Sequence, residues 1–115
     1  MDDMLSWLLV GHMAGDYLFQ TRWMAEQKTT RLSALAVHSA VYACAVWLAS
    51  LSAGGLSYPS VLFVFVTHAA LDRRSFVLWW CRNVTHSDLP WLVIMTDQAM
   101  HCVILAMVCF FERSI

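Results

Sequence analysis

The sequence predicts an all-α protein, a bundle of four transmembrane helices. Apolar residues make up 60% of the chain and charged residues only 13%, whereas about a quarter of the residues in a soluble domain are charged. Four apolar segments approach the length of about 20 residues that a helix needs to cross a bilayer. Because a backbone in lipid must satisfy its own hydrogen bonds, each segment is expected to be helical. The 115 residues suffice for a single domain, residues 1–115.

The connections between these segments differ in charge. The first connection, residues 22–31, is polar and basic, the second, residues 50–60, is uncharged, and the third, residues 73–88, carries three arginines. By the positive-inside rule the first and third connections face the cytoplasm and both termini lie outside, as in a multi-pass protein of the inner (plasma) membrane. Within the third connection, residues 75–80 have the apolar and aromatic composition of an interfacial helix. The predicted spans are residues 4–20, 33–53, 57–72 and 89–111.

Ionisable side chains interrupt every predicted span. In three spans a histidine and an aspartate are four residues apart, a spacing that places both on one face of a helix. At about 1.5 Å per residue from the cytoplasmic helix ends, the groups lie at similar depths, with Asp72 the shallowest. The sequence therefore predicts one cluster in the cytoplasmic half of the bundle. The pairs are His12 with Asp16, His68 with Asp72, and Asp97 with His101, and the second span adds His38.

Mixed histidine and aspartate side chains are typical ligands of a divalent metal, with zinc the first choice and manganese or iron the alternatives. The seven groups exceed the four ligands of a tetrahedral zinc, whereas two metals about 3.5 to 4 Å apart, bridged by an aspartate, would use them all. The alternative is a metal-free hydrogen-bond network that ties the helices together or relays protons. Unrelated, scattered polar residues are a third interpretation.

The leading functional hypothesis is a metal-dependent hydrolase that acts near the cytoplasmic membrane face on a lipid-like or phosphoester substrate. A bound metal activates water and polarises the bond to be cut. Asp16 and Asp72 are the candidate catalytic residues, with Asp72 expected nearest to the entering substrate.

Two further functional classes stay open. One is a small transporter or channel component for an ion, a proton or a small solute. It would require a homo-oligomer, because the outer halves of the spans offer few polar groups. The other is a structural or phage accessory membrane protein without catalysis. The formal net charge of −1 and the absence of a dense basic run argue against nucleic acid as a partner.

Three residues near the first His–Asp pair have expected supporting roles. Gly11 and Gly15 are small residues that would let another helix approach closely. Gln20 lies eight residues after His12, on the same helix face, where it either supports the cluster or lies at the membrane interface.

The order of these motifs resembles a known family. The stretch Gly-His-Met-Ala-Gly-Asp-Tyr-Leu-Phe-Gln-Thr covers residues 11–21 and is followed by Trp-Met-Ala-Glu-Gln-Lys at 23–28. A histidine on the second span, His-x-x-x-Asp on the third and Asp-Gln-Ala-x-His on the fourth complete the pattern. Over nearly the whole chain this pattern resembles the bacterial and phage membrane family known as domain of unknown function 3307. The resemblance implies a multi-pass membrane protein of prokaryotic or phage origin and no particular activity.

Overall fold

Helices account for nearly all of the secondary structure in the computed structural model, which describes residues 3–114. No strand occurs among these residues, so the predicted all-α class is confirmed. The α-helices are α1 (Met4–Met13), α2 (Arg22–Gln27), α3 (Leu32–Ser50), α4 (Tyr58–Asp72), α5 (Ser75–Asn83) and α6 (Pro90–Ser114). A π-helical turn, Ala14–Leu18, continues α1, and a 3-10 turn, Leu51–Ala53, continues α3.

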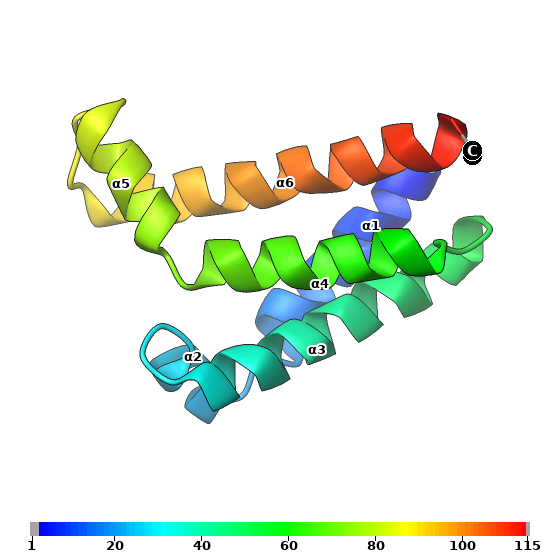
Figure 1. Cartoon of the computed structure of the whole chain (residues 1–115), viewed down its shortest axis with the longest axis horizontal. Coiled ribbons are helices and arrows are strands. Elements are labelled where there is room, and N and C mark those ends of the chain that lie inside the picture. The colour runs from blue at the N-terminus through cyan, green and yellow to red at the C-terminus, as the bar shows by residue number, and fades with distance from the viewer. Residues whose placement is uncertain (1–2, 115) are drawn as a thin grey trace.

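Four of the helices form a closed ring. Helix α3 packs against α1 and α4, and α6 packs against the same two helices from the opposite side. Figure 1 shows α3, α4 and α6 running lengthwise, with α1 behind them. Helices α2 and α5 lie at the end of the bundle that is remote from the C-terminus. The two basic connections of the sequence are therefore at the same end of the molecule.

The prediction of four full-length membrane spans is not supported by the helix lengths. Two helical segments, Leu32–Ala53 and Pro90–Arg113, are long and apolar enough to cross a membrane. Helix α4 has 15 residues and rises only about 22 Å, less than the hydrocarbon thickness of about 30 Å. The first predicted span consists of the 10 residues of α1 and a π-helical turn of 5 residues, which is equally short.

The polar connections contain more helix than the sequence indicated. Residues 22–31 were expected to form a connection, but α2 occupies most of it. Thr21 caps this helix, since its side-chain oxygen accepts a hydrogen bond from the backbone N–H of Met24 at 3.3 Å. The helix expected within residues 75–80 is confirmed as α5, and Arg74 precedes it in a left-handed conformation with φ 68°.

Gly11 and Gly15 lie where α1 and its π-helical turn cross α3. A Cβ atom on Gly11 would lie 2.6 Å from the Cα atom of Val46, and one on Gly15 would lie 2.9 Å from the Cα atom of Tyr42. Both obstacles are backbone atoms, which cannot move aside as a flexible side chain can. The prediction that these glycines permit close helix approach is confirmed, and the approach brings α1 and α3 into position for the cluster described next.

Candidate metal centre

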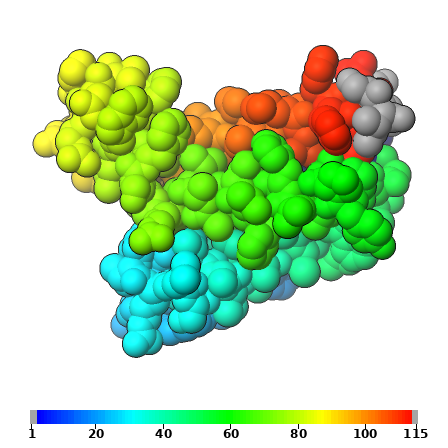
Figure 2. Space-filling view, viewed as in Figure 1, coloured from blue at the N-terminus to red at the C-terminus, as the bar shows by residue number. Residues whose placement is uncertain are grey.

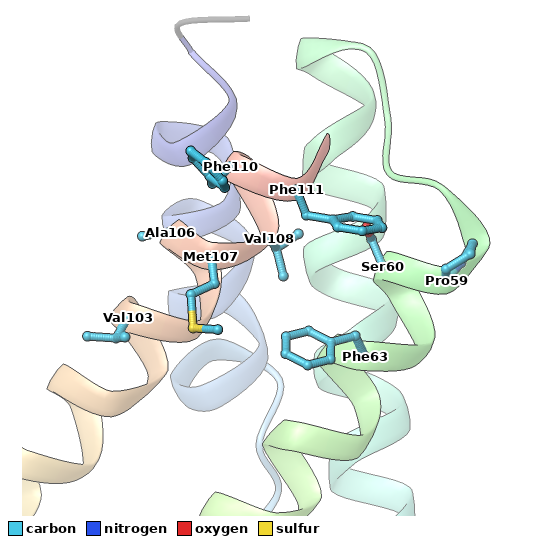
Figure 3. Close-up of a pocket in the computed structure, with 9 residues that line it drawn as sticks. All are labelled: Pro59, Ser60, Phe63, Val103, Ala106, Met107, Val108, Phe110 and Phe111. Atoms are coloured by element: carbon cyan, nitrogen blue, oxygen red, sulfur yellow. The ribbon is translucent and has the colours of Figure 1, made fainter. Parts of the chain in front are cut away.

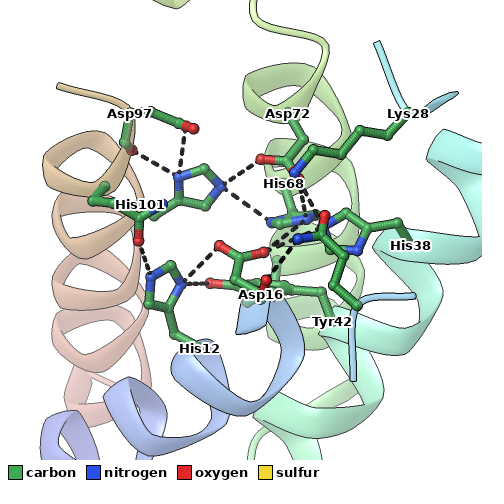
Figure 4. A network of polar contacts seen from close by, with 12 residues as sticks. His12, Asp16, Lys28, His38, Tyr42, His68, Asp72, Asp97 and His101 are labelled. Carbon is green, nitrogen blue, oxygen red and sulfur yellow. Dashed lines mark hydrogen bonds and ion pairs between the residues drawn. The ribbon is translucent and has the colours of Figure 1, made fainter. Parts of the chain in front are cut away.

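Seven ionisable side chains from four helices meet inside the bundle (Figure 4). None of them is more than 4% exposed. Nitrogen–oxygen contacts of 2.7 to 3.7 Å link all seven into one connected group. The prediction of a single cluster is thus confirmed. We call it the His–Asp cluster; its members are His12, Asp16, His38, His68, Asp72, Asp97 and His101.

The π-helical turn carries Asp16 into the cluster. A π-helical turn inside an α-helix is rare and often occurs at functional sites. Gln20 supports the turn, because its side-chain amide donates a hydrogen bond of 2.8 Å to the backbone carbonyl of Asp16. Of the two roles considered for Gln20, support of the cluster is the one that this contact favours.

Four atoms of the cluster form a closed ring of contacts. His38 Nε2 lies 3.2 Å from Asp16 Oδ1 and 2.7 Å from Asp72 Oδ2. His68 Nε2 lies 3.7 Å from Asp16 Oδ1 and 3.1 Å from Asp72 Oδ2. Two nitrogen and two oxygen atoms therefore alternate around a ring of four contacts.

Three of these four atoms make no aligned hydrogen bond. His38 Nε2, His68 Nε2 and Asp16 Oδ1 are buried without a hydrogen-bond partner among the described residues, whereas buried polar atoms normally have one. In a tetrahedral zinc site with bonds of about 2.0 to 2.1 Å, neighbouring ligand atoms are roughly 3.3 Å apart. That separation falls within the observed 2.7 to 3.7 Å. The donor set and its spacing therefore fit a divalent cation.

A second grouping overlaps the first. Ligand atoms of Asp16, His68, Asp72 and His101 all lie within 4.8 Å of one another. Asp72 takes part in both groupings: its Oδ2 faces His38 and His68, and its Oδ1 lies 3.3 Å from His101 Nε2. A carboxylate that presents its two oxygens to different histidines has the arrangement of a bridging ligand.

Asp97 lies on the far side of His101 from Asp72. His101 Nδ1 lies 2.7 Å from the backbone carbonyl of Asp97 and 3.1 Å from Asp97 Oδ1, and Arg74 Nη2 lies 3.6 Å from Asp97 Oδ2. A bond at one ring nitrogen commonly orients the other nitrogen of a metal-binding histidine. Asp97 was predicted as a direct ligand, but this geometry favours a role in orienting His101.

The hydrogen bonds also indicate where lone pairs point. A neutral His101 that donates from Nδ1 accepts at Nε2, and His68 Nδ1 lies 3.2 Å from that atom. His68 Nε2 then carries a lone pair toward the carboxylates of Asp16 and Asp72. A lone pair and an anionic oxygen attract each other only through a cation between them. That cation is either a proton on an imidazole or a metal ion, which are the two alternatives that the sequence left open.

His12 is held by two polar groups outside the cluster. Its Nδ1 lies 2.7 Å from the Tyr42 hydroxyl, and its Nε2 lies 2.7 Å from Gln98 Oε1. Since the amide oxygen accepts, Nε2 carries the proton and Nδ1 accepts from the tyrosine O–H. Asp16 Oδ2 is 3.6 Å from the same Nδ1. The role of His12 as a metal ligand stays a prediction, and its nitrogens are already engaged in this arrangement.

Lys28 lies at the edge of the cluster, next to Asp72. Its ammonium donates a hydrogen bond of 2.9 Å to Asp72 Oδ2, and only 10% of the lysine side chain is exposed. Asp72 is itself 1% exposed and contacts three histidines. Asp72 is the last residue of α4 and is nevertheless covered, because Lys28, in the turn that follows α2, lies against it. Its place as the shallowest member of the cluster stays a prediction.

The charges in the cluster and its two basic neighbours nearly balance. Three carboxylates face two cations, Lys28 and Arg74, which leaves one negative charge if all the imidazoles are neutral. A proton on one imidazole would neutralise this charge. A bound divalent cation would change the net charge of these groups from negative to positive. The site would then favour an additional anionic ligand.

Four contacting residues were not predicted as part of the site from the sequence. From the sequence, Arg74 is interpreted first as a topology determinant, with contact to an anionic head group or a phosphate as the minor alternative, and Lys28 only as part of a basic connection. Tyr42 lies four residues after His38 and stacks on His68 with ring centroids 3.7 Å apart, so helical spacing could have found it. No sequence signal singles out Lys28, because its contact joins residues 44 positions apart. The four residues are Lys28, Tyr42, Arg74 and Gln98.

The fold and site define a class: a small all-helical protein with a buried His–Asp cluster at one end of a four-helix ring. The chain belongs to the family described as protein of unknown function (DUF3307), which matches residues 4–114. The family resemblance of the sequence is thereby confirmed. No curated protein and no solved structure shows significant similarity to the chain.

Proposed function

We propose that the protein is an integral membrane protein. The two long apolar helices support this, because only 39% of the apolar window of α3 and 22% of that of α6 are buried within the protein. The core helix of a soluble protein is mostly buried. Large apolar side chains such as Leu48, Leu62 and Phe110 are more than half exposed, and lipid would cover them.

Two further features support contact with lipid. At the end of the bundle away from the His–Asp cluster, a cavity of about 750 Å³ lies between α4 and α6, lined by Phe63, Phe111 and other mainly apolar residues (Figure 3). Helix α5 projects from the opposite end of the molecule (Figure 2) and exposes Phe76, Trp79 and Trp80. Aromatic side chains of this kind are enriched at membrane interfaces.

The proposed orientation places α2 and α5 in the cytoplasm and both termini outside. In a cysteine-free background, Thr29→Cys and Asn83→Cys should be protected from an impermeant thiol reagent added to intact cells. Ser52→Cys, at the opposite end, should react. Labelling of Thr29→Cys from outside, with Ser52→Cys protected, would reverse the orientation and place the cluster in the other leaflet.

We further propose that the His–Asp cluster holds a divalent metal, with zinc the first choice and manganese or iron the alternatives. The observation that carries this proposal is the ring of His38 Nε2, Asp16 Oδ1, His68 Nε2 and Asp72 Oδ2, three of whose atoms make no hydrogen bond. His101 Nε2 would complete a second position beside the other oxygen of Asp72, in place of the hydrogen bond between His101 and His68.

The chemistry that such a site supports best is hydrolysis of a phosphoester or a lipid-like ester. In phosphoester hydrolysis a water oxygen bonds to phosphorus, the bond to the alcohol oxygen breaks, and a proton passes from the water to the alcohol. Asp16 would hold the metal through Oδ1, and its other oxygen, Oδ2, lies outside the ring, so Oδ2 is the atom that would accept the proton of the attacking water. Asp72, held by Lys28 and three histidines, keeps the surrounding groups in position.

Elemental analysis of the protein purified in detergent without chelator tests the metal directly. We expect about one or two equivalents of zinc, manganese or iron per chain, and metal-dependent release of phosphate from a phosphatidate substrate. Asp16→Asn should abolish that release while the protein still melts cooperatively. Protein that is metal-free and stays so when metal is supplied would rule the proposal out.

A metal-free proton network is the second candidate, and the charge count favours it. One protonated imidazole neutralises the single negative charge that Lys28 and Arg74 leave among the three carboxylates. The absence of metal together with intact stability would support this structural or relay function. A transporter is less favoured. Buried apolar residues fill the other half of the ring, among them Leu8, Val46 and Leu105, so a single chain shows no polar path beyond the cluster among its described residues.

A further inference from the structure

A second cavity lies beside the His–Asp cluster, between the turn that follows α2 and the end of α4. Its volume is about 150 Å³. None of the seven cluster residues lines it, but Lys28 belongs to its wall and also bonds Asp72. In Figure 2 the cyan surface of α2 and its turn meets the yellow-green surface at the end of α4. The lining residues are Lys28, Thr29, Thr30, Arg31, Leu32, Leu35 and Arg73.

The polar lining of this cavity is entirely cationic or hydroxylic. Three basic residues and two threonines line it, and no acidic residue does. Lys28 forms an ion pair with Asp72. Arg31 and Arg73 are exposed and form no ion pair with any carboxylate in residues 3–114. Thr30 donates its hydroxyl hydrogen to the backbone carbonyl of Gln27, which leaves the Thr29 hydroxyl. Two unpaired guanidinium groups and a hydroxyl donor at one cavity are the chemistry that recognises a phosphate group.

We propose that this cavity binds the phosphate group of an anionic ligand, either a free phosphate ester or the headgroup of a lipid. Its volume of about 150 Å³ is room for a phosphate group and not for a large ligand. Leu32, at the rim, is 73% exposed and offers an apolar contact for the part of the ligand outside the cavity.

Lys28 connects the cavity to the cluster. Its ammonium lies 2.9 Å from Asp72 Oδ2, so an anion in the cavity and Asp72 attract the same cation. The phosphate would therefore lie next to the carboxylate that contacts three cluster histidines. The inference rests on the proposed function only in its last step, in which this phosphate belongs to the substrate; the binding itself requires no metal.

Calorimetric titration of inorganic phosphate into the full chain in detergent, after treatment with chelator, tests the binding separately from the metal. We expect saturable binding that weakens about tenfold for each of Arg31→Gln and Arg73→Gln, since each removes a charged hydrogen-bond donor. Arg82→Gln removes an exposed arginine from α5 and should bind phosphate like the unaltered protein. Melting temperatures would confirm that all three variants fold.

Competition distinguishes the two sources of phosphate. In nanodiscs of phosphatidylcholine doped with phosphatidate, loss of phosphate binding identifies a lipid headgroup as the ligand. Retained binding identifies a free phosphate ester. The absence of saturable phosphate binding, or an equal loss in Arg82→Gln, would show that these arginines only set the topology and would overturn the inference. A failure to find metal would leave this result unaffected.

Discussion

Replacing Asp72 by asparagine is expected to destabilise the protein more than any other single change in the His–Asp cluster. The substitution keeps the shape of the side chain but removes its charge. It would leave the ammonium of Lys28, which lies 2.9 Å away and is largely buried, without its counter-ion. Removing one partner of a buried ion pair costs about 3 to 5 kcal/mol. Unfolding in mixed detergent micelles, measured in chelator so that metal does not contribute, would give the change in the free energy of unfolding.

Two further variants test whether the lost stability comes from the ion pair between Lys28 and Asp72. Asp88→Asn changes an exposed aspartate and should alter the free energy of unfolding by less than about 0.5 kcal/mol. Adding Lys28→Met to Asp72→Asn removes the stranded cation and should restore part of the lost stability, as a double-mutant cycle would show. Unchanged stability of Asp72→Asn would contradict the central position of this carboxylate.

His38→Ala is expected to reduce metal affinity by more than roughly 100-fold, because groups that only orient a metal ligand already account for about 10 to 100-fold. The imidazole of His38 is fully buried, and its Nε2 contacts both Asp16 and Asp72. Metal affinity would be measured by competition with a chelator of known affinity. His38→Gln, which preserves more of the side-chain volume, should lose metal similarly while it folds more stably than the alanine variant.

Two further variants provide comparisons for the metal affinity of His38→Ala. His86→Ala removes an exposed histidine from the loop before α6 and should leave metal affinity unchanged. Asp97→Asn should weaken affinity by about 10 to 100-fold, as expected for a group that orients His101 without binding metal. Equal affinity of His38→Ala and His86→Ala would favour the metal-free network.

The members of the cluster could be predicted from the sequence because their signal is local. A histidine and an aspartate four residues apart share one face of any α-helix, so His68 and Asp72 converge whatever the rest of the chain does. The same holds for the helical class, which follows from the apolar composition of the segments. The glycines of the first segment likewise indicate close packing by their size alone.

The sequence patterns did not predict two features of the backbone, the π-helical turn after α1 and helix α2. Apolar composition extended the first predicted span to residue 20, but regular α-helix ends at Met13 and the π-helical turn follows. Composition does not indicate such a turn, which lies where Gly15 packs closely against Tyr42 on α3. Helix α2 was not predicted because its capping signal, Thr21, is a single residue in a polar segment.

The sequence by itself determined that this is a helical protein and which seven ionisable residues converge. Only the tertiary structure decided which atoms face one another: His38 with both Asp16 and Asp72, Asp97 behind His101, and Lys28 against Asp72. The physical reason is that the two kinds of information act over different distances along the chain. Helical periodicity fixes the face on which a side chain lies, whereas the rotation and depth of each helix depend on packing against its neighbours. Contacts between residues far apart in the chain, such as the 44 positions between Lys28 and Asp72, follow only from that packing.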